Sequence, residues 1–76
     1  MYYYIIFMQI VFTKHAKDMM KKRNISEDEV ISAIKYPEIT YKEEGLYYAQ
    51  KNIGRANIEI VYERDKYIKV VTIYFL

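Results

Sequence analysis

A single proline, Pro37, divides this sequence into a helix-forming part and a strand-forming part. Proline disfavours helical backbone at the residue before it, so a helix that precedes Pro37 must end by Tyr36. After Pro37, the only two glycines, Gly45 and Gly54, separate runs that are rich in β-branched and aromatic residues. With so few loop-forming residues, the 76-residue chain predicts a single domain over residues 1–76, without linkers or disorder.

Two helices are predicted before Pro37, each with its own start signal. Thr13 offers an N-cap hydroxyl to a helix over residues 14–23, and Asn24 suits the left-handed residue that closes a helix. Ser26 and Glu29, three residues apart, form a capping box for a second helix. The stripes expected to be buried are Ala16, Met19, Met20 and Arg23 in the first helix and Val30, Ala33 and Ile34 in the second.

The other residues predict strands, in the overall order β-α-α-β-β-β-β. Residues 2–12 are almost wholly apolar on both faces, which predicts a strand that is covered on both sides. The expected fold is therefore α+β, with two N-terminal helices packed on a twisted antiparallel sheet. The later predicted strands are residues 39–43, 46–53, 57–64 and 67–76, with turns at Gly54-Arg55 and Asp65-Lys66.

Two helices cannot cover both faces of such a sheet. The alternation in residues 57–64 places Glu59 and Glu63 on the face opposite Ile58, Ile60 and Tyr62. An uncovered aromatic face is expected to meet a partner, and a second copy of the chain is the simplest one, so we predict a homodimer through this sheet face. The candidate tyrosines for this face are Tyr3, Tyr47, Tyr48, Tyr67 and Tyr74.

The residue inventory excludes most catalytic chemistry. With no cysteine and one histidine, the chain offers no thiolate nucleophile and no His-rich metal cluster, and its acidic residues lack metal-binding spacing. There is no phosphate-binding glycine loop, so we expect neither a metal nor a cofactor. The apolar run 2–12 is too short to span a membrane, and no basic run precedes it, so no membrane association and a cytoplasmic location are expected.

Cleavage of RNA is the reaction class that the residues of this chain still permit. RNA supplies its own nucleophile, the 2′-hydroxyl, so a protein need only move protons and stabilise the charge on the phosphate. His15 in the first turn of the first helix is the candidate proton-transfer group, with Arg23 and Tyr62 as further catalytic candidates. The alternatives are a packed or capping His15, an Arg23 that only complements the helix dipole, and a Tyr62 that lies in the core.

Three further cations are candidates for contacts with RNA phosphates. Arg55 lies in a predicted hairpin turn, Arg64 lies at a strand end, and Lys14 begins the first helix. The alternative for such residues is a solvated surface charge. The net charge of +2 permits a local basic patch but does not require one.

Residues 12–30 resemble a known signature, Phe-x-x-His-Ala-x-x-Arg-Met-x-x-Arg-x-Ile followed by a capped acidic helix. It occurs in a small domain of unknown function that is similar to BrnT-like members of the RelE/ParE toxin superfamily. The resemblance extends over roughly residues 10–76 and implies a RelE-like fold and a toxin of a toxin–antitoxin system. It also implies a metal-independent endoribonuclease that an antitoxin protein neutralises. The matching residues are His15, Ala16, Met20, Arg23 and Ile25, whereas Met19 stands where the family commonly has arginine.

Three hypotheses therefore remain open. The chain is a toxin-like ribonuclease, a non-catalytic dimeric module that binds protein through its aromatic sheet face, or a nucleic-acid-binding module without chemistry. The last of these predicts an affinity that falls steeply with salt concentration.

Overall fold

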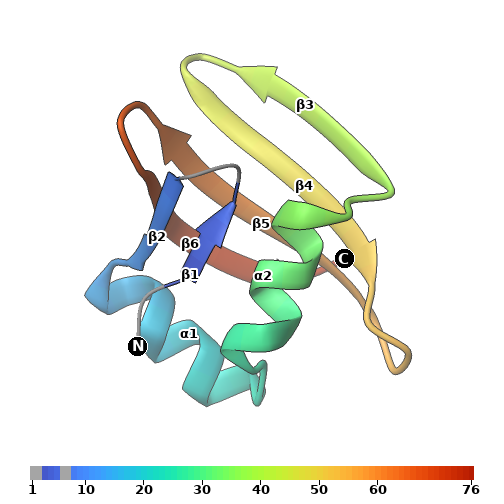
Figure 1. Ribbon diagram of the computed structural model, residues 1–76. Coiled ribbons are helices and arrows are strands. Elements are labelled where there is room, and N and C mark those ends of the chain that lie inside the picture. Colours follow the sequence, from blue (N-terminus) through green and yellow to red (C-terminus); the bar gives the residue numbers. More distant parts are fainter. Residues whose placement is uncertain (1–2, 6–7) are drawn as a thin grey trace.

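The computed structural model describes the backbone of residues 3–5 and the whole of residues 8–76. Within this part of the chain, helices α1 (Lys14–Arg23) and α2 (Glu27–Lys35) lie on one side of a six-stranded sheet (Figure 1). The predicted α+β class is thereby confirmed. The strands are β1 (Tyr3–Ile5), β2 (Met8–Phe12), β3 (Ile39–Glu43), β4 (Leu46–Asn52), β5 (Asn57–Arg64) and β6 (Ile68–Phe75).

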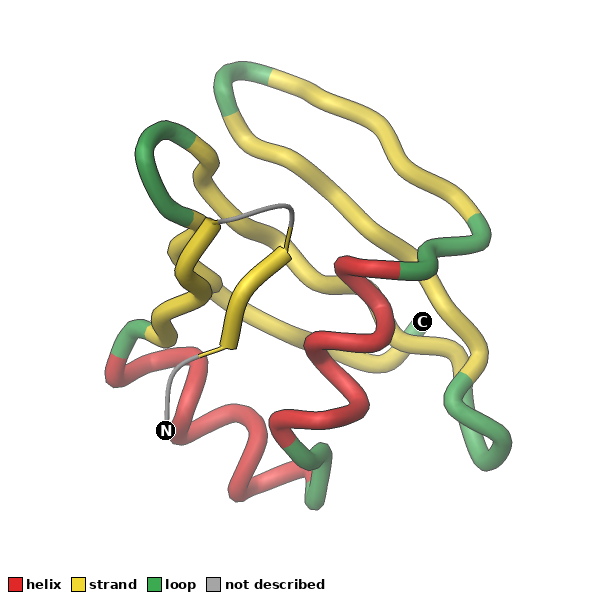
Figure 2. The backbone as a smooth tube through the Cα atoms, in the orientation of Figure 1, coloured by secondary structure: helices red, strands yellow, loops and turns green. Residues whose placement is uncertain are grey.

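The strand order across the sheet is β1-β2-β6-β5-β4-β3. Figure 2 shows the long strands in yellow, joined by short loops in green. Strands β3 to β6 form an antiparallel meander, but β2 and β6 run parallel, with Ile10 opposite Ile68. The prediction of a purely antiparallel sheet was therefore wrong. The two helices carry the chain from β2 to the far edge of the sheet, and such a long crossover permits parallel pairing with the returning strand.

The predicted first strand, residues 2–12, is divided into two. Strand β1 pairs antiparallel with β2, with Tyr3 opposite Ile10, and residues 1–2 and 6–7 lie outside the described residues. A single strand of this length would extend about 36 Å. The longest dimension of the fold is 31 Å, so two short paired strands fit within it, whereas one strand of this length would project beyond it.

The predicted helix boundaries are confirmed. The Thr13 hydroxyl accepts the backbone N–H of Ala16 at 3.0 Å, and Asn24 closes α1 in the left-handed conformation with φ 55°. Ser26 and Glu29 form the reciprocal capping box at the start of α2. Helix α2 ends at Lys35, before Pro37.

The hydrophobic core lies between the two helices and one face of the sheet. Ile58, Ile60 and Tyr62 of β5 point into it, as the alternation predicted, whereas Glu59 lies on the opposite, helix-free face. The core also contains Ala16 and Met20 of α1, Val30, Ala33 and Ile34 of α2, and Val70 and Ile73 of β6. Among the described residues, no helix has the length and apolar character needed to span a membrane.

Candidate nucleic-acid interface

Helix α1 concentrates the positive charge of the molecule. It carries five cations and one anion, a net charge of +4, whereas the rest of the chain carries seven cations and nine anions, a net charge of −2. The four lysines of α1 are all exposed to solvent, because its apolar side is limited to the buried residues Ala16 and Met20 and the half-buried Met19. The exposed side of α1 is therefore a basic surface, which we call the α1 surface and define by Lys14, Lys17, Lys21 and Lys22.

Helix α1 is held firmly against β6 at its N-terminal end. The backbone N–H of Thr13 donates to the Val70 carbonyl at 3.0 Å, and the Thr13 hydroxyl donates to the Val71 carbonyl at 3.1 Å. The exposed His15 is hydrogen-bonded through Nε2 to Oγ1 of Thr72 at 3.1 Å. His15 is therefore anchored at the edge of β6 while its ring remains accessible next to the α1 surface.

Arg23 lies at the other end of α1 from His15. Arg23 comes eight positions after His15, which corresponds to about 12 Å along the helix axis. The Arg23 guanidinium contacts the sulfur of Met19 at 2.7 Å, one turn back along the helix. His15 and Arg23 therefore do not meet around a single phosphate.

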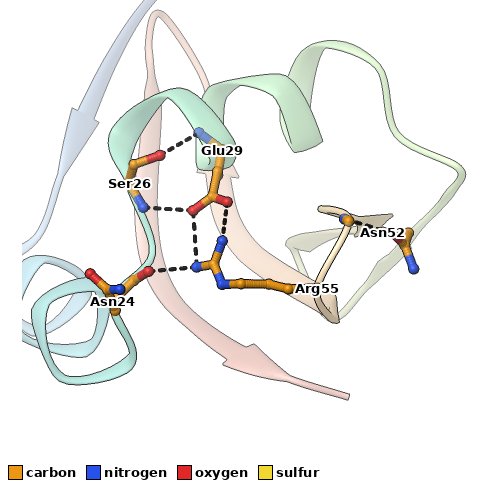
Figure 3. A network of polar contacts seen from close by, with 6 residues as sticks. Asn24, Ser26, Glu29, Asn52 and Arg55 are labelled. Atoms are coloured by element: carbon orange, nitrogen blue, oxygen red, sulfur yellow. Dashed lines mark hydrogen bonds and ion pairs between the residues drawn. The ribbon is translucent and has the colours of Figure 1, made fainter.

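Arg55 is occupied in a structural network that joins the β4–β5 turn to the start of α2 (Figure 3). Its guanidinium donates to both carboxylate oxygens of Glu29 and to the backbone carbonyl of Asn24. Hydrogen bonds from Arg55 and from the Ser26 backbone lower the pKa of Glu29 below its ordinary value. The Glu29 carboxylate thus takes part both in the capping box and in the ion pair with Arg55. Arg55 is therefore not a solvated charge in the turn that is free to bind phosphate.

Arg64 lies at the end of β5 opposite to Arg55. An eight-residue strand is roughly 25 Å long, so the two arginines cannot bind neighbouring phosphates. Arg64 is exposed and borders an open depression near the β5–β6 turn, where two acidic side chains balance two cations. The residues around this depression are Gly45, Glu63, Arg64, Asp65, Tyr67 and Lys69.

Tyr62 is a core residue. Its side chain is 6% exposed and its ring stacks on Tyr47, with centroids 5.4 Å apart. Burial raises the pKa of Tyr62. This position matches the alternative stated for Tyr62, and it leaves no room for a substrate beside the ring.

The helix-free face holds a polar cluster that the sequence did not single out. Glu59, at the centre of this face, is only 3% exposed. Its carboxylate accepts hydrogen bonds from the Tyr41 hydroxyl at 2.7 Å, from the Gln50 amide at 3.1 Å, and from the Tyr74 hydroxyl. Tyr41 in turn stacks on Tyr48 with ring centroids 4.6 Å apart. Gln50 and Tyr74 are the cross-strand neighbours of Glu59, so pairing the predicted strands in register would have indicated this cluster.

The hydrogen bonds determine the electrostatics of this cluster. Burial alone would raise the pKa of Glu59, but the hydrogen bonds from Tyr74, Tyr41 and Gln50 outweigh it, and the pKa is below the ordinary value. Glu59 therefore stays ionised. The hydrogen bond to the ionised carboxylate raises the pKa of Tyr41 to about 12 and raises that of Tyr74 as well.

The tyrosines predicted for the uncovered face divide between two sides of the sheet. Tyr48 and Tyr74 lie on the helix-free face, whereas Tyr47 stacks on the core residue Tyr62. Tyr67 is exposed beside the β5–β6 turn, and the side chain of Tyr3 lies outside the described residues.

The six predicted site residues thus do not form one catalytic cleft. The structure brings together only His15 and Lys14, at the start of the α1 surface. No group of three or more metal-ligating side chains occurs among residues 3–5 and 8–76. The arrangement is a row of exposed cations along α1 with one accessible imidazole beside it.

Comparison with known proteins identifies one family. A profile described as Domain of unknown function (DUF4258) matches residues 12–75, which is nearly the whole chain. Searches of curated proteins and of solved structures found no significant match.

Proposed function

The chain belongs to the DUF4258 family, and we propose that it is a nucleic-acid-binding module whose α1 surface lies along the phosphate backbone of RNA. The observation that carries this proposal is the separation of charge, with a net +4 on α1 and a net −2 on all other residues. Cations that are clustered on one helix provide the electrostatic footprint of a nucleic-acid-binding protein.

The geometry of α1 suits a flexible single strand. Lys14, Lys17 and Lys21 follow one another at spacings of three and four residues, so they project from the same side of the helix. The span from Lys14 to Lys21 is about 10 Å, which is long enough to reach consecutive phosphates. Asp18 pairs with Lys14 at 3.7 Å, but this contact is exposed and therefore weak.

The resemblance to BrnT-like, RelE-like toxins extends the proposal to chemistry. His15 adjoins the α1 surface and is accessible, so it is the group that would move a proton to or from RNA without a metal. An antitoxin protein with an acidic segment would neutralise the same surface by competing for the lysines. Replacement of His15 by alanine should abolish cleavage of RNA in EDTA while leaving RNA binding largely intact.

Protein binding through the helix-free face is a second candidate function. It is favoured by the exposure of Ile39 (55%) and Tyr41 (40%), which lie on this face. The partner would be a second copy or an antitoxin. Replacing Tyr48 with serine should then weaken self-association in analytical ultracentrifugation.

Charge-reversed variants test the RNA proposal against a matched control. The test variant is Lys17→Glu/Lys21→Glu, and the control is Lys35→Glu/Lys66→Glu, which changes the total charge by the same amount at two exposed lysines away from α1. Binding to a fluorescein-labelled 20-nucleotide RNA is followed by anisotropy. We expect the test variant to lose at least about tenfold in affinity and the control to lose less than about threefold.

The salt dependence provides the second measurement. If about four lysines neutralise phosphates, the logarithm of the affinity should fall with the logarithm of KCl concentration with a slope of about −3. Equal losses for the two variants, or an affinity that does not change between 50 and 200 mM KCl, would refute the proposal.

A further inference from the structure

Strand β3 is an open edge of the sheet. Among residues 3–5 and 8–76 it pairs only with β4, and all five of its residues, Ile39–Glu43, are exposed. Figure 1 shows β3 at the outside of the meander with no helix or strand along its outer side. Its outward-pointing backbone N–H and C=O groups are therefore available to another strand.

This edge lacks most of the devices that prevent strands from pairing with other molecules. Proteins usually protect edges with proline, with bulges or with several charges. Strand β3 has no proline and pairs with β4 in continuous register, and its charges are limited to Lys42 and Glu43 at one end of the strand. It also exposes two large apolar side chains, Ile39 and Tyr41, at 55% and 40%.

We propose that two copies of the chain pair antiparallel through β3 about a two-fold axis at Thr40. This pairing would join the two sheets into one continuous sheet. The proposal is independent of RNA binding. Helix α1 packs on β6 and β2, whereas β3 is the strand at the opposite edge of the sheet. The proposed pairing is an alternative to self-association through the helix-free face, and Tyr48→Ser, which lies on that face, should not change a dimer that forms at the sheet edge.

Symmetry limits the possible registers. When the two-fold axis is perpendicular to the sheet, the helix-free faces of both copies lie on the same side of the joined sheet. Residues directly opposite each other must therefore have side chains on the same face. Because side chains alternate between the faces along a strand, the axis must pass between one residue and the same residue of the second copy. Within β3 the three central choices are Thr40, Tyr41 and Lys42.

The register centred on Thr40 is the most complementary. It places Ile39 opposite Tyr41 of the second copy, and by symmetry the same pair forms twice. It also places Lys42 opposite Glu38 of the second copy, again twice. One oxygen of the Glu38 carboxylate accepts the Asn52 backbone N–H at 2.6 Å, which leaves the other oxygen for the lysine. Aromatic pairs with β-branched residues and pairs of opposite charge are the cross-strand combinations that stabilise sheets.

The other two registers are less favourable. An axis at Tyr41 pairs the two Tyr41 rings once, but it twice places the apolar Ile39 opposite the carboxylate of Glu43 and twice leaves Lys42 opposite Thr40. An axis at Lys42 places the two Lys42 side chains directly opposite each other, which is destabilising. Charge and apolar pairing thus both select Thr40 as the centre.

Single-cysteine variants test this register directly, because the chain has no cysteine of its own. Opposed residues in an antiparallel pair have Cα atoms about 4.5–5.5 Å apart, within the range of a disulfide. In the proposed dimer this holds for Thr40→Cys, whereas two Lys42→Cys residues would lie about 13 Å apart along the strands. Tyr41→Cys is the third variant and reports on the competing register.

The cysteine variants are oxidised at 100 µM protein and analysed by non-reducing electrophoresis. We expect the Thr40→Cys variant to form covalent dimers at least about tenfold faster than the other two. Faster cross-linking of Tyr41→Cys or Lys42→Cys, or equal rates for all three, would overturn the proposed register.

Sedimentation equilibrium of the cysteine-free chain tests the association itself. We expect a reversible dimer, and we expect Lys42→Glu to weaken it by about tenfold, since two attractive pairs become repulsive. Lys66→Glu, in the β5–β6 turn, is the control and should not change association. Circular dichroism must show that both variants remain folded. A wild-type chain that stays monomeric at 300 µM would overturn the proposal.

Discussion

Replacement of Glu59 by glutamine tests whether the polar cluster on the helix-free face stabilises the fold. Glutamine has nearly the same shape, but it removes the negative charge that three donors share. The donors are the hydroxyls of Tyr41 and Tyr74 and the amide of Gln50. Among the described residues, no buried side-chain nitrogen or oxygen lacks a partner, so the cluster is fully paired before the change.

The expected cost follows from the number and type of these hydrogen bonds. A hydrogen bond to a charged group contributes about 1.5–3 kcal/mol, and a neutral one about 1 kcal/mol. Glutamine keeps one acceptor oxygen, and Tyr41 is exposed enough for its hydroxyl to turn to water. We therefore expect the free energy of unfolding to fall by about 2 kcal/mol and the melting temperature by about 10 °C.

The assay is urea unfolding of both proteins at pH 7, followed by circular dichroism, and repeated at lower pH. The pKa of Glu59 is lower in the folded state than its ordinary value of 4.5. The stabilisation from its ionised form is therefore complete above about pH 4.5 and is lost as the pH falls through the folded-state pKa. The difference between the two proteins should shrink in the acid range.

Glu29 also has a lowered pKa, but it is present in both proteins and cancels in the difference. A loss of less than about 0.5 kcal/mol at pH 7 would refute the reasoning, because a hydrogen bond to a buried charge should contribute more than that. A difference that does not change between pH 7 and pH 3 would refute the assignment of the pH effect to Glu59.

Three further predictions concern single contacts. Arg55→Met removes the link between the β4–β5 turn and α2 and should lower the urea concentration at the midpoint of unfolding, whereas an unchanged midpoint would show that the network does not stabilise the fold. Asn24 has a φ of 55°, so Asn24→Gly should be nearly neutral and Asn24→Ala should cost about 1 kcal/mol; equal costs would contradict the left-handed cap. The pKa of Tyr41, about 12, should fall toward 10 in Glu59→Gln when it is titrated by NMR of ¹³C-labelled tyrosine, and a value that stays near 12 would exclude Glu59 as the cause.

The local structure of the helices and hairpins could be predicted because its signals lie within a few residues of one another. The Thr13 and Ser26 caps, the left-handed Asn24 and the bounds of β3 and β5 all follow from such short patterns. The parallel pairing of β2 with β6 could not be predicted in this way. It depends on which strand the chain meets after crossing the whole sheet, and no local pattern encodes that choice.

The candidate site was harder to predict than the fold. A lone arginine in a turn looks available, yet Arg55 meets Glu29, which is 26 residues earlier in the chain. Tyr62 was correctly placed on the core face, and that placement is incompatible with a role beside a substrate. Glu59 was expected on the face opposite the core, but its burial depends on Tyr41 and Tyr74 from two other strands.

The position of β6 has a consequence for how the chain acquires its structure during synthesis. This last strand lies between β2 and β5 in the sheet, and Val70 and Val71 receive the hydrogen bonds that anchor the start of α1. A ribosome adds about 5–20 residues per second, so β2 and α1 wait for several seconds without their neighbour. Until residues 68–75 emerge, the nascent chain exposes apolar strand surface that a chaperone can bind, and a chain that stops before this point lacks the strand that anchors α1.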